Sequence, residues 1–240
     1  PLLAAENYSD LINKAGMQRM LSQRIAKSYL YLGNGISTRE NSLQLDMATT
    51  RFKKNHSQLT SKVKDAEVQN LLSFVEETFS SYLDLSQKKY SKKNATSILE
   101  MSEVLLETSH AIVLRLEELS GLKIDRVINV SGKQRMLSQR VGKYYIAYQA
   151  GFRDDYTVTQ LNNAMTEFES GLKLLQGEKR NTKKIKALLD KVEEEWKRIS
   201  PYFLKVRKGG LQVIVLTATD EITVLSDKIT KLYVETTNSK

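Results

Sequence analysis

The chain has no cysteine, and only two prolines and two histidines occur in its 240 residues. The absence of cysteine excludes disulfides, thiolate nucleophiles and zinc–thiolate sites. Scarce proline permits long helices, because an internal proline removes a backbone hydrogen bond and clashes with the preceding turn. Long apolar runs are also missing: the longest, Leu211–Leu216, already contains Gln212. It falls far short of the roughly 18 residues that a membrane span needs.

The net charge of +9 comes mostly from two basic clusters, Lys179–Lys186 and Lys205–Lys208. No aromatic residues interleave with these lysines, as a stacking surface for nucleic acid requires. We therefore expect solvated helix ends and loops, and no nucleic-acid partner. The chain begins at Pro1 and shows no signal peptide, which we interpret as the mark of a fragment from a longer protein.

A repeat organises the whole sequence. The segment Leu11–Leu32 reads LINKAGMQRMLSQRIAKSYLYL, and Val127–Tyr148 reads VINVSGKQRMLSQRVGKYYIAY. At an offset of 116 residues, 12 of these 22 positions are identical, including an unbroken QRMLSQR. Similar spacing of apolar residues continues beyond this segment. The chain is thus interpreted as a tandem duplication, with modules at residues 1–121 and 122–240.

Each segment has the periodicity of a helix. Apolar residues recur at intervals of three and four, as at Met17, Leu21 and Ile25, and no segment alternates as a strand does. The sequence predicts an all-α fold of two tandem antiparallel four-helix bundles, with eight helices in total. The predicted polar or glycine-rich breaks fall at 33–35, 61–65, 88–94, 120–123, 151–154, 176–182 and 205–210.

The sequence offers little to support catalysis. The histidines are His56 and His110, and Glu107–His110 has the Glu-x-x-His spacing of di-iron bundles. Such bundles need two of these motifs, and the other histidine follows Lys-Lys-Asn instead. We therefore expect a solvated or hydrogen-bonded His110, no metal, no cofactor and no enzymatic activity.

The duplication has kept polar residues more strictly than core residues. Gly16, Arg19 and Gln23 are spaced by three and four, so they share one helical face. A glycine inside a helix costs about 1 kcal/mol relative to alanine, so it suggests that another backbone approaches closely. An arginine one turn away is then placed to bind a planar anion through paired hydrogen bonds. The matching set in the second copy is Gly132, Arg135 and Gln139.

A structural role is the alternative interpretation of the conserved arginines. They would form ion pairs with glutamates of the third and seventh helices, and for Arg24 and Arg140 this is at least as good an interpretation as ligand binding. Met20 and Met136 are expected in the core. The glutamates considered as partners are Glu76, Glu77, Glu193 and Glu194.

The shared motif, N-x-[AS]-G-x-x-R-M-L-S-Q-R-x-x-K at Asn13–Lys27 and Asn129–Lys143, resembles the signature of PilJ-type sensory domains. It is also similar to the P-box helix of nitrate/nitrite sensor kinases. The resemblance implies a periplasmic four-helix bundle between two membrane helices of an inner-membrane receptor, which works as a homodimer. The flanking helices and a cytoplasmic kinase, chemotaxis or cyclase module would lie outside this chain.

In the nitrate sensors, the anion lies at a dimer interface, held by the arginine three residues after the motif glycine. The resemblance implies the same role for Arg19 and Arg135, and for a lysine that is Lys14 here but Val130 in the second copy. The alternative is a module that detects a pilus subunit or another periplasmic protein. The candidate anion-binding residues are Arg19, Arg135, Lys14, Gly16, Gly132, Gln23 and Gln139, with Arg24, Arg140, Asn13 and Asn129 as secondary candidates.

The junction between the copies decides how they are arranged. Gly121 is suited to cap the fourth helix and Asp125 to help start the fifth, so we expect the chain to reverse at residues 120–125. The halves would then lie side by side, with the first and fifth helices parallel. Arg19 and Arg135 would share one anion site. A continuous helix with bundles end to end is the alternative.

Overall fold

The computed structural model describes the backbone of residues 8–238, and the side chains of that range except 123–125 and 237–238. Within these residues the chain forms eight α-helices, one 3-10 turn and no strand, which confirms the predicted fold class. The elements are α1 (Tyr8–Gly33), α2 (Thr38–Lys62), α3 (Ala66–Ser86), α4 (Lys92–Ser120), α5 (Lys123–Gln149), α6 (Asp155–Gln176), α7 (Lys183–Leu204), η1 (Val206–Lys208) and α8 (Gln212–Asn238).

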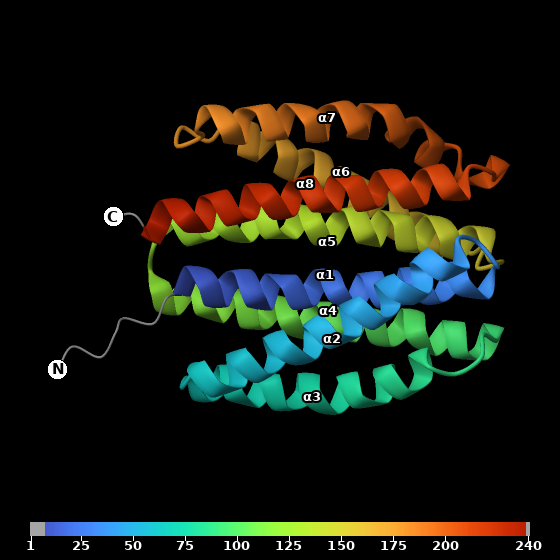
Figure 1. Cartoon of the computed structure of the whole chain (residues 1–240), viewed down its shortest axis with the longest axis horizontal. Helices are drawn as coiled ribbons and strands as arrows, with labels where there is room; N and C mark the ends of the chain where they lie inside the picture. The colour runs from blue at the N-terminus through green and yellow to red at the C-terminus, as the bar shows by residue number, and fades with distance from the viewer. Residues whose placement is uncertain (1–7, 239–240) are drawn as a thin grey trace.

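The two groups of four helices lie side by side, as predicted. Helices α1–α4 form one antiparallel bundle and α5–α8 the other, and α1 packs along α5 at the centre of the molecule. Figure 1 shows these two helices running in the same direction, with α3 and α7 at opposite outer edges. The repeated motif therefore lies on the two helices that join the bundles.

The chain reverses sharply between the two bundles. Helix α4 ends at Ser120, and Gly121 has a φ of 64°, a left-handed conformation that glycine adopts without strain. Its N–H donates to the carbonyl of Glu117, and α5 begins two residues later. The continuous helix is thereby excluded. The side chain of Asp125 lies outside the described residues, so its proposed role stays a prediction.

Several helices begin at the breaks that the sequence predicts, because side chains there cap the first turn. Asp65, Asp154 and Thr182 each accept a hydrogen bond from a backbone N–H three residues later. Such caps satisfy amide groups that have no partner within the helix. No described helix is both long enough and apolar enough to cross a membrane.

Helices α1 and α5 are buried on nearly every side, which is unusual for helices rich in charged residues. Arg19, Lys27, Arg135 and Lys143 are each at most 1% exposed. Burying an ionised group is costly unless it is paired and hydrogen-bonded, so the partners of these cations decide what the central layer does. Met20 and Met136 are both in the core, as predicted.

Candidate functional site

Arg19 and Arg135 meet between the two motif glycines. A Cβ atom built on Gly16 would lie 3.1 Å from Nη2 of Arg19 and 3.6 Å from Nη2 of Arg135. A Cβ on Gly132 would lie 3.0 Å from Nη2 of Arg135 and 3.7 Å from Nη2 of Arg19. Both guanidinium groups thus fill the space that the glycines leave between α1 and α5. The predicted convergence of the two arginines is confirmed.

Each arginine also reaches across to the other half. Nη2 of Arg19 donates to the carbonyl oxygen of Asn129 at 3.5 Å, and Nη2 of Arg135 donates to the carbonyl oxygen of Asn13 at 3.4 Å. These bonds are long, and within the described residues Nε of both arginines and Oδ1 of both asparagines are buried without a hydrogen-bond partner. The pair therefore retains buried donors that a ligand would satisfy.

The outer partners of the two arginines differ. Nη1 of Arg19 lies 3.0 Å from Nδ1 of His110 on α4, whereas Nη1 of Arg135 donates to Oδ1 of Asp227 on α8 at 2.7 Å. A guanidinium only donates, so Nδ1 of His110 is the acceptor and the ring is neutral, with its proton on Nε2. These two positions are equivalent in the two halves at an offset of 117 residues. The predicted hydrogen-bonded histidine is confirmed.

The two like charges face each other in a dry environment. Burial and the charge of Arg135 lower the pKa of Arg19 to about 9, although Glu117 acts in the opposite direction. Burial also lowers the pKa of Arg135, and Asp227 offsets part of this effect. Burial, together with Arg19 and Lys133, lowers the pKa of His110 to about 4. The pair thus carries positive charge that has little access to water.

The remaining candidates lie at other places. Nε2 of Gln23 donates to the carbonyl oxygen of Ser102 on α4 at 2.9 Å, and Nε2 of Gln139 donates to Asp220 and Thr223 on α8. These amides, one turn beyond the arginines, tie α1 to α4 and α5 to α8. Lys14 forms an ion pair with Asp10 one turn earlier on its own helix. Its role as an anion ligand stays a prediction.

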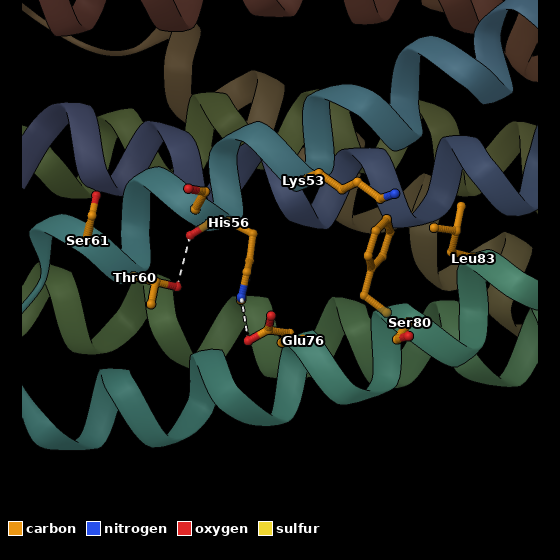
Figure 2. Close-up of a pocket in the computed structure, with 9 residues that line it drawn as sticks. Lys53, His56, Thr60, Ser61, Glu76, Ser80 and Leu83 are labelled. Carbon is orange, nitrogen blue, oxygen red and sulfur yellow. Dashed lines mark hydrogen bonds and ion pairs between the residues drawn. The ribbon is translucent and has the colours of Figure 1, made fainter.

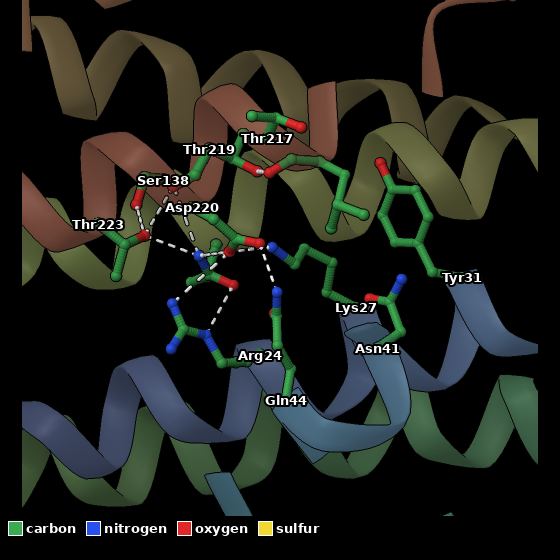
Figure 3. Close-up of polar contacts among 12 residues, drawn as sticks. Arg24, Lys27, Tyr31, Asn41, Gln44, Ser138, Thr217, Thr219, Asp220 and Thr223 are labelled. Carbon is green, nitrogen blue, oxygen red and sulfur yellow. Dashed lines mark hydrogen bonds and ion pairs between the residues drawn. The ribbon is translucent and has the colours of Figure 1, made fainter. Parts of the chain in front are cut away.

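Asp220 forms a second charged layer between the halves. Its carboxylate on α8 lies 2.5 Å from Nζ of Lys27 and 3.6 Å from Nη2 of Arg24, both on α1. Figure 3 shows these cations, together with Gln44 of α2, converging on the carboxylate from the first half. Asp220 is therefore a carboxylate of the second bundle that pairs with cations of the first.

Glu103 is the corresponding carboxylate of the first bundle, and it pairs with cations of the second. Its carboxylate on α4 lies 2.5 Å from both Nζ of Lys143 and Nη2 of Arg140, which belong to α5. Burial lowers the pKa of Lys143 to about 8, against the attraction of Glu103. Arg24 and Arg140 do form ion pairs, but the predicted partners were wrong. The acids come from α4 and α8 of the opposite half, because these helices, and not α3 and α7, flank the central pair.

Cavities are also present among the described residues, and one of them borders the central layer through Glu103. One of about 600 Å³ opens between α2 and α3, where Figure 2 shows His56 directed at Glu76, with Nε2 3.9 Å from the carboxylate. Another of about 500 Å³ lies where α4, α5 and α6 meet and includes Tyr144 and Phe152 in its wall. Sequence reasoning predicted neither cavity.

Sequence reasoning also missed the acidic partners, Glu103, Asp220 and Asp227. A usable signal was present in one case: Glu103 and Asp220 are equivalent at an offset of 117 and both carry a carboxylate. The sequences of α4 and α8 otherwise agree only in apolar spacing, so this match was not distinctive.

Comparison with known proteins gives one match. A model of the PilJ family, described as the type IV pili methyl-accepting chemotaxis transducer N-terminal region, matches residues 3–100 and 122–222. The two matched segments together cover most of the chain, one in each half. No curated protein and no solved structure matched.

Proposed function

Since the chain belongs to the PilJ family of type IV pili methyl-accepting chemotaxis transducer N-terminal domains, we propose that it is the extracytoplasmic sensing domain of a bacterial transmembrane receptor and that its ligand is a small anion. Nitrate and nitrite are the first ligands to test. The family assigns the chain to sensory input in signal transduction. In this proposal the membrane helices and the output module belong to the rest of the receptor.

The observation that carries this proposal is the buried pair of guanidinium groups between α1 and α5. Arg19 and Arg135 are at most 1% exposed, and both have an Nε without a hydrogen-bond partner in the described chain. Two facing cations in a medium of low dielectric repel each other strongly. A planar oxyanion would relieve this repulsion and accept paired, charge-assisted hydrogen bonds.

The position of the arginine pair between the two bundles suggests how anion binding could be transmitted through the receptor. The arginines come from the central helix of each bundle, so an anion between them changes the energy of the contact between the bundles. A ligand shifts a conformational equilibrium only if it binds the two states with different affinity. An arrangement with α1 and α5 drawn together around the anion would bind it more tightly than one with the arginines apart. We propose that this difference drives the receptor.

The test is thermal unfolding with nitrate, nitrite and chloride, followed by calorimetry. Nitrate should raise the melting temperature of the parent chain. Replacement of Arg19 or Arg135 by alanine removes a charge-assisted hydrogen bond worth about 1.5–3 kcal/mol. The affinity should thus fall by about tenfold to a hundredfold. Arg126→Ala is the matched control, because Arg126 is an exposed arginine of α5.

Two results would contradict the proposal. If both arginine variants bind nitrate as the parent does, the site is wrong. If the parent binds none of the anions, the alternative of a module that detects a pilus subunit or a periplasmic protein gains support.

A further inference from the structure

The two halves share one hydrogen-bonding frame around the arginine pair but differ in charge. Each arginine reaches the carbonyl oxygen of the asparagine on the opposite helix, and each has its second contact on the last helix of its own half. That second contact is the carboxylate of Asp227 for Arg135 and the neutral ring of His110 for Arg19. Arg135 forms a close ion pair with a carboxylate, whereas Arg19 forms none among the described side chains.

We propose that Asp227 acts as a resident counter-ion, so that the chain binds one monovalent oxyanion, on the Arg19 side of the pair next to His110. This inference rests on the proposed anion sensing and adds the stoichiometry, the charge and the orientation of the ligand. The anion would lie beside His110 and supply to Arg19 the negative charge that the carboxylate of Asp227 supplies to Arg135.

The charges around the arginine pair favour the binding of a single anion. Arg135 and Asp227 form an ion pair of 2.7 Å, whereas Arg19 forms no ion pair with any described carboxylate. Glu117 also attracts Arg19, and its Oε2 accepts a hydrogen bond from Nδ2 of Asn129 at 2.8 Å. The carboxylate of Asp227 is shared with Lys231, whose Nζ lies 2.7 Å from Oδ2. Three cations, Arg19, Arg135 and Lys231, thus face the two carboxylates of Asp227 and Glu117, and the site needs about one further negative charge.

The same charges argue against a divalent anion. A second negative charge on the ligand would face Asp227 and Glu117. Two further cations act on this cluster, Lys133 and Lys231, but they already pair with Glu167 and Asp227. The carboxylate of Asp227 also indicates the shape that fits, since a planar group with two oxygens satisfies a guanidinium. Nitrate, nitrite and small carboxylates such as acetate match both requirements, and sulfate does not.

The test exchanges residues at equivalent positions of the two halves. His110→Asp introduces the carboxylate that the second half already has, whereas His110→Asn keeps a neutral hydrogen-bonding side chain. Calorimetry with nitrate should give one anion per parent chain. The affinity should be at least tenfold lower in His110→Asp than in His110→Asn. Asp227→Asn frees Arg135 and should bind sulfate more tightly than the parent does.

The inference is overturned if His110→Asp binds nitrate as tightly as His110→Asn, or if the parent binds two nitrate ions. In both cases the proposed anion sensing itself would stand. If the parent binds neither nitrate nor acetate, that function fails. The missing counter-ion of Arg19 can then be tested separately, by the melting temperature measured without added anions. His110→Asp should melt at a higher temperature than His110→Asn because Arg19 gains a counter-ion. An equal or lower melting temperature would refute the claim that Arg19 needs one.

Discussion

Acidification should destabilise this protein in part through His110. The charged groups that act on its ring are Arg19 of α1, Lys133 of α5 and Glu167 of α6. Burial has the largest effect, and with the two cations it lowers the pKa of His110 from 6.5 to about 4. The folded chain therefore binds fewer protons than the unfolded chain between these two values, and the free energy of unfolding falls as the pH falls through this window.

The magnitude follows from the two pKa values. Each pH unit across the window is worth about 1.4 kcal/mol, so the full difference is at most about 3.5 kcal/mol. The ring of His110 is only partly buried, and solvent screening reduces this value. We expect a loss of about 1–3 kcal/mol between pH 6.5 and pH 4, complete below the folded pKa.

Urea unfolding from about pH 7 to about pH 4 measures this loss. His110→Asn keeps a hydrogen-bond acceptor for Arg19 and cannot take up a proton, so its stability should fall less than that of the parent. His56→Asn measures the separate contribution of the other histidine, whose pKa burial also lowers and which contacts Gln18 rather than an arginine. Parallel pH profiles for the parent and His110→Asn would refute the reasoning.

The remaining predictions concern the central layer. Glu103→Gln should lower the free energy of unfolding by about 3–5 kcal/mol, because two buried cations of α5 lose their shared carboxylate. The exposed Glu100→Gln is its control in urea unfolding, and equal stability of the two variants would contradict the prediction. Gly16→Ala places a methyl group 3.1 Å from Nη2 of Arg19 and should weaken nitrate binding about tenfold in calorimetry. Its stability should hold, since alanine favours the helix by up to about 1 kcal/mol, and unchanged nitrate affinity would speak against the site.

The sequence was sufficient to predict the helices, their breaks and the meeting of Arg19 with Arg135. The reason is that the duplication repeats the polar face of α1 in α5, and the cap at Gly121 forces a reversal. With both copies of one face at the centre, the equivalent arginines have to approach each other. The repeat, the helical periodicity and the glycine at the junction were together enough for this part of the structure.

The residues that pair with the arginines could not be predicted from the repeat and its periodicity. Helical periodicity shows which residues share a face, but it does not show which helix covers that face. Arg24 pairs with Asp220, 196 residues later, because α8 of the second half packs beside α1. The sequence likewise did not show that His110 and Asp227 are the equivalent partners of Arg19 and Arg135. In contrast, the ion pair of Lys14 with Asp10 follows the spacing of four residues that helices favour.

The most direct test of the central claim is a crystal structure of the chain grown with nitrate. We predict planar density between α1 and α5 that contacts the guanidinium groups of Arg19 and Arg135, on the side of His110. Nitrate bound only elsewhere, or two arginines in contact with protein groups alone at saturating nitrate, would contradict the claim that this pair is the sensing site.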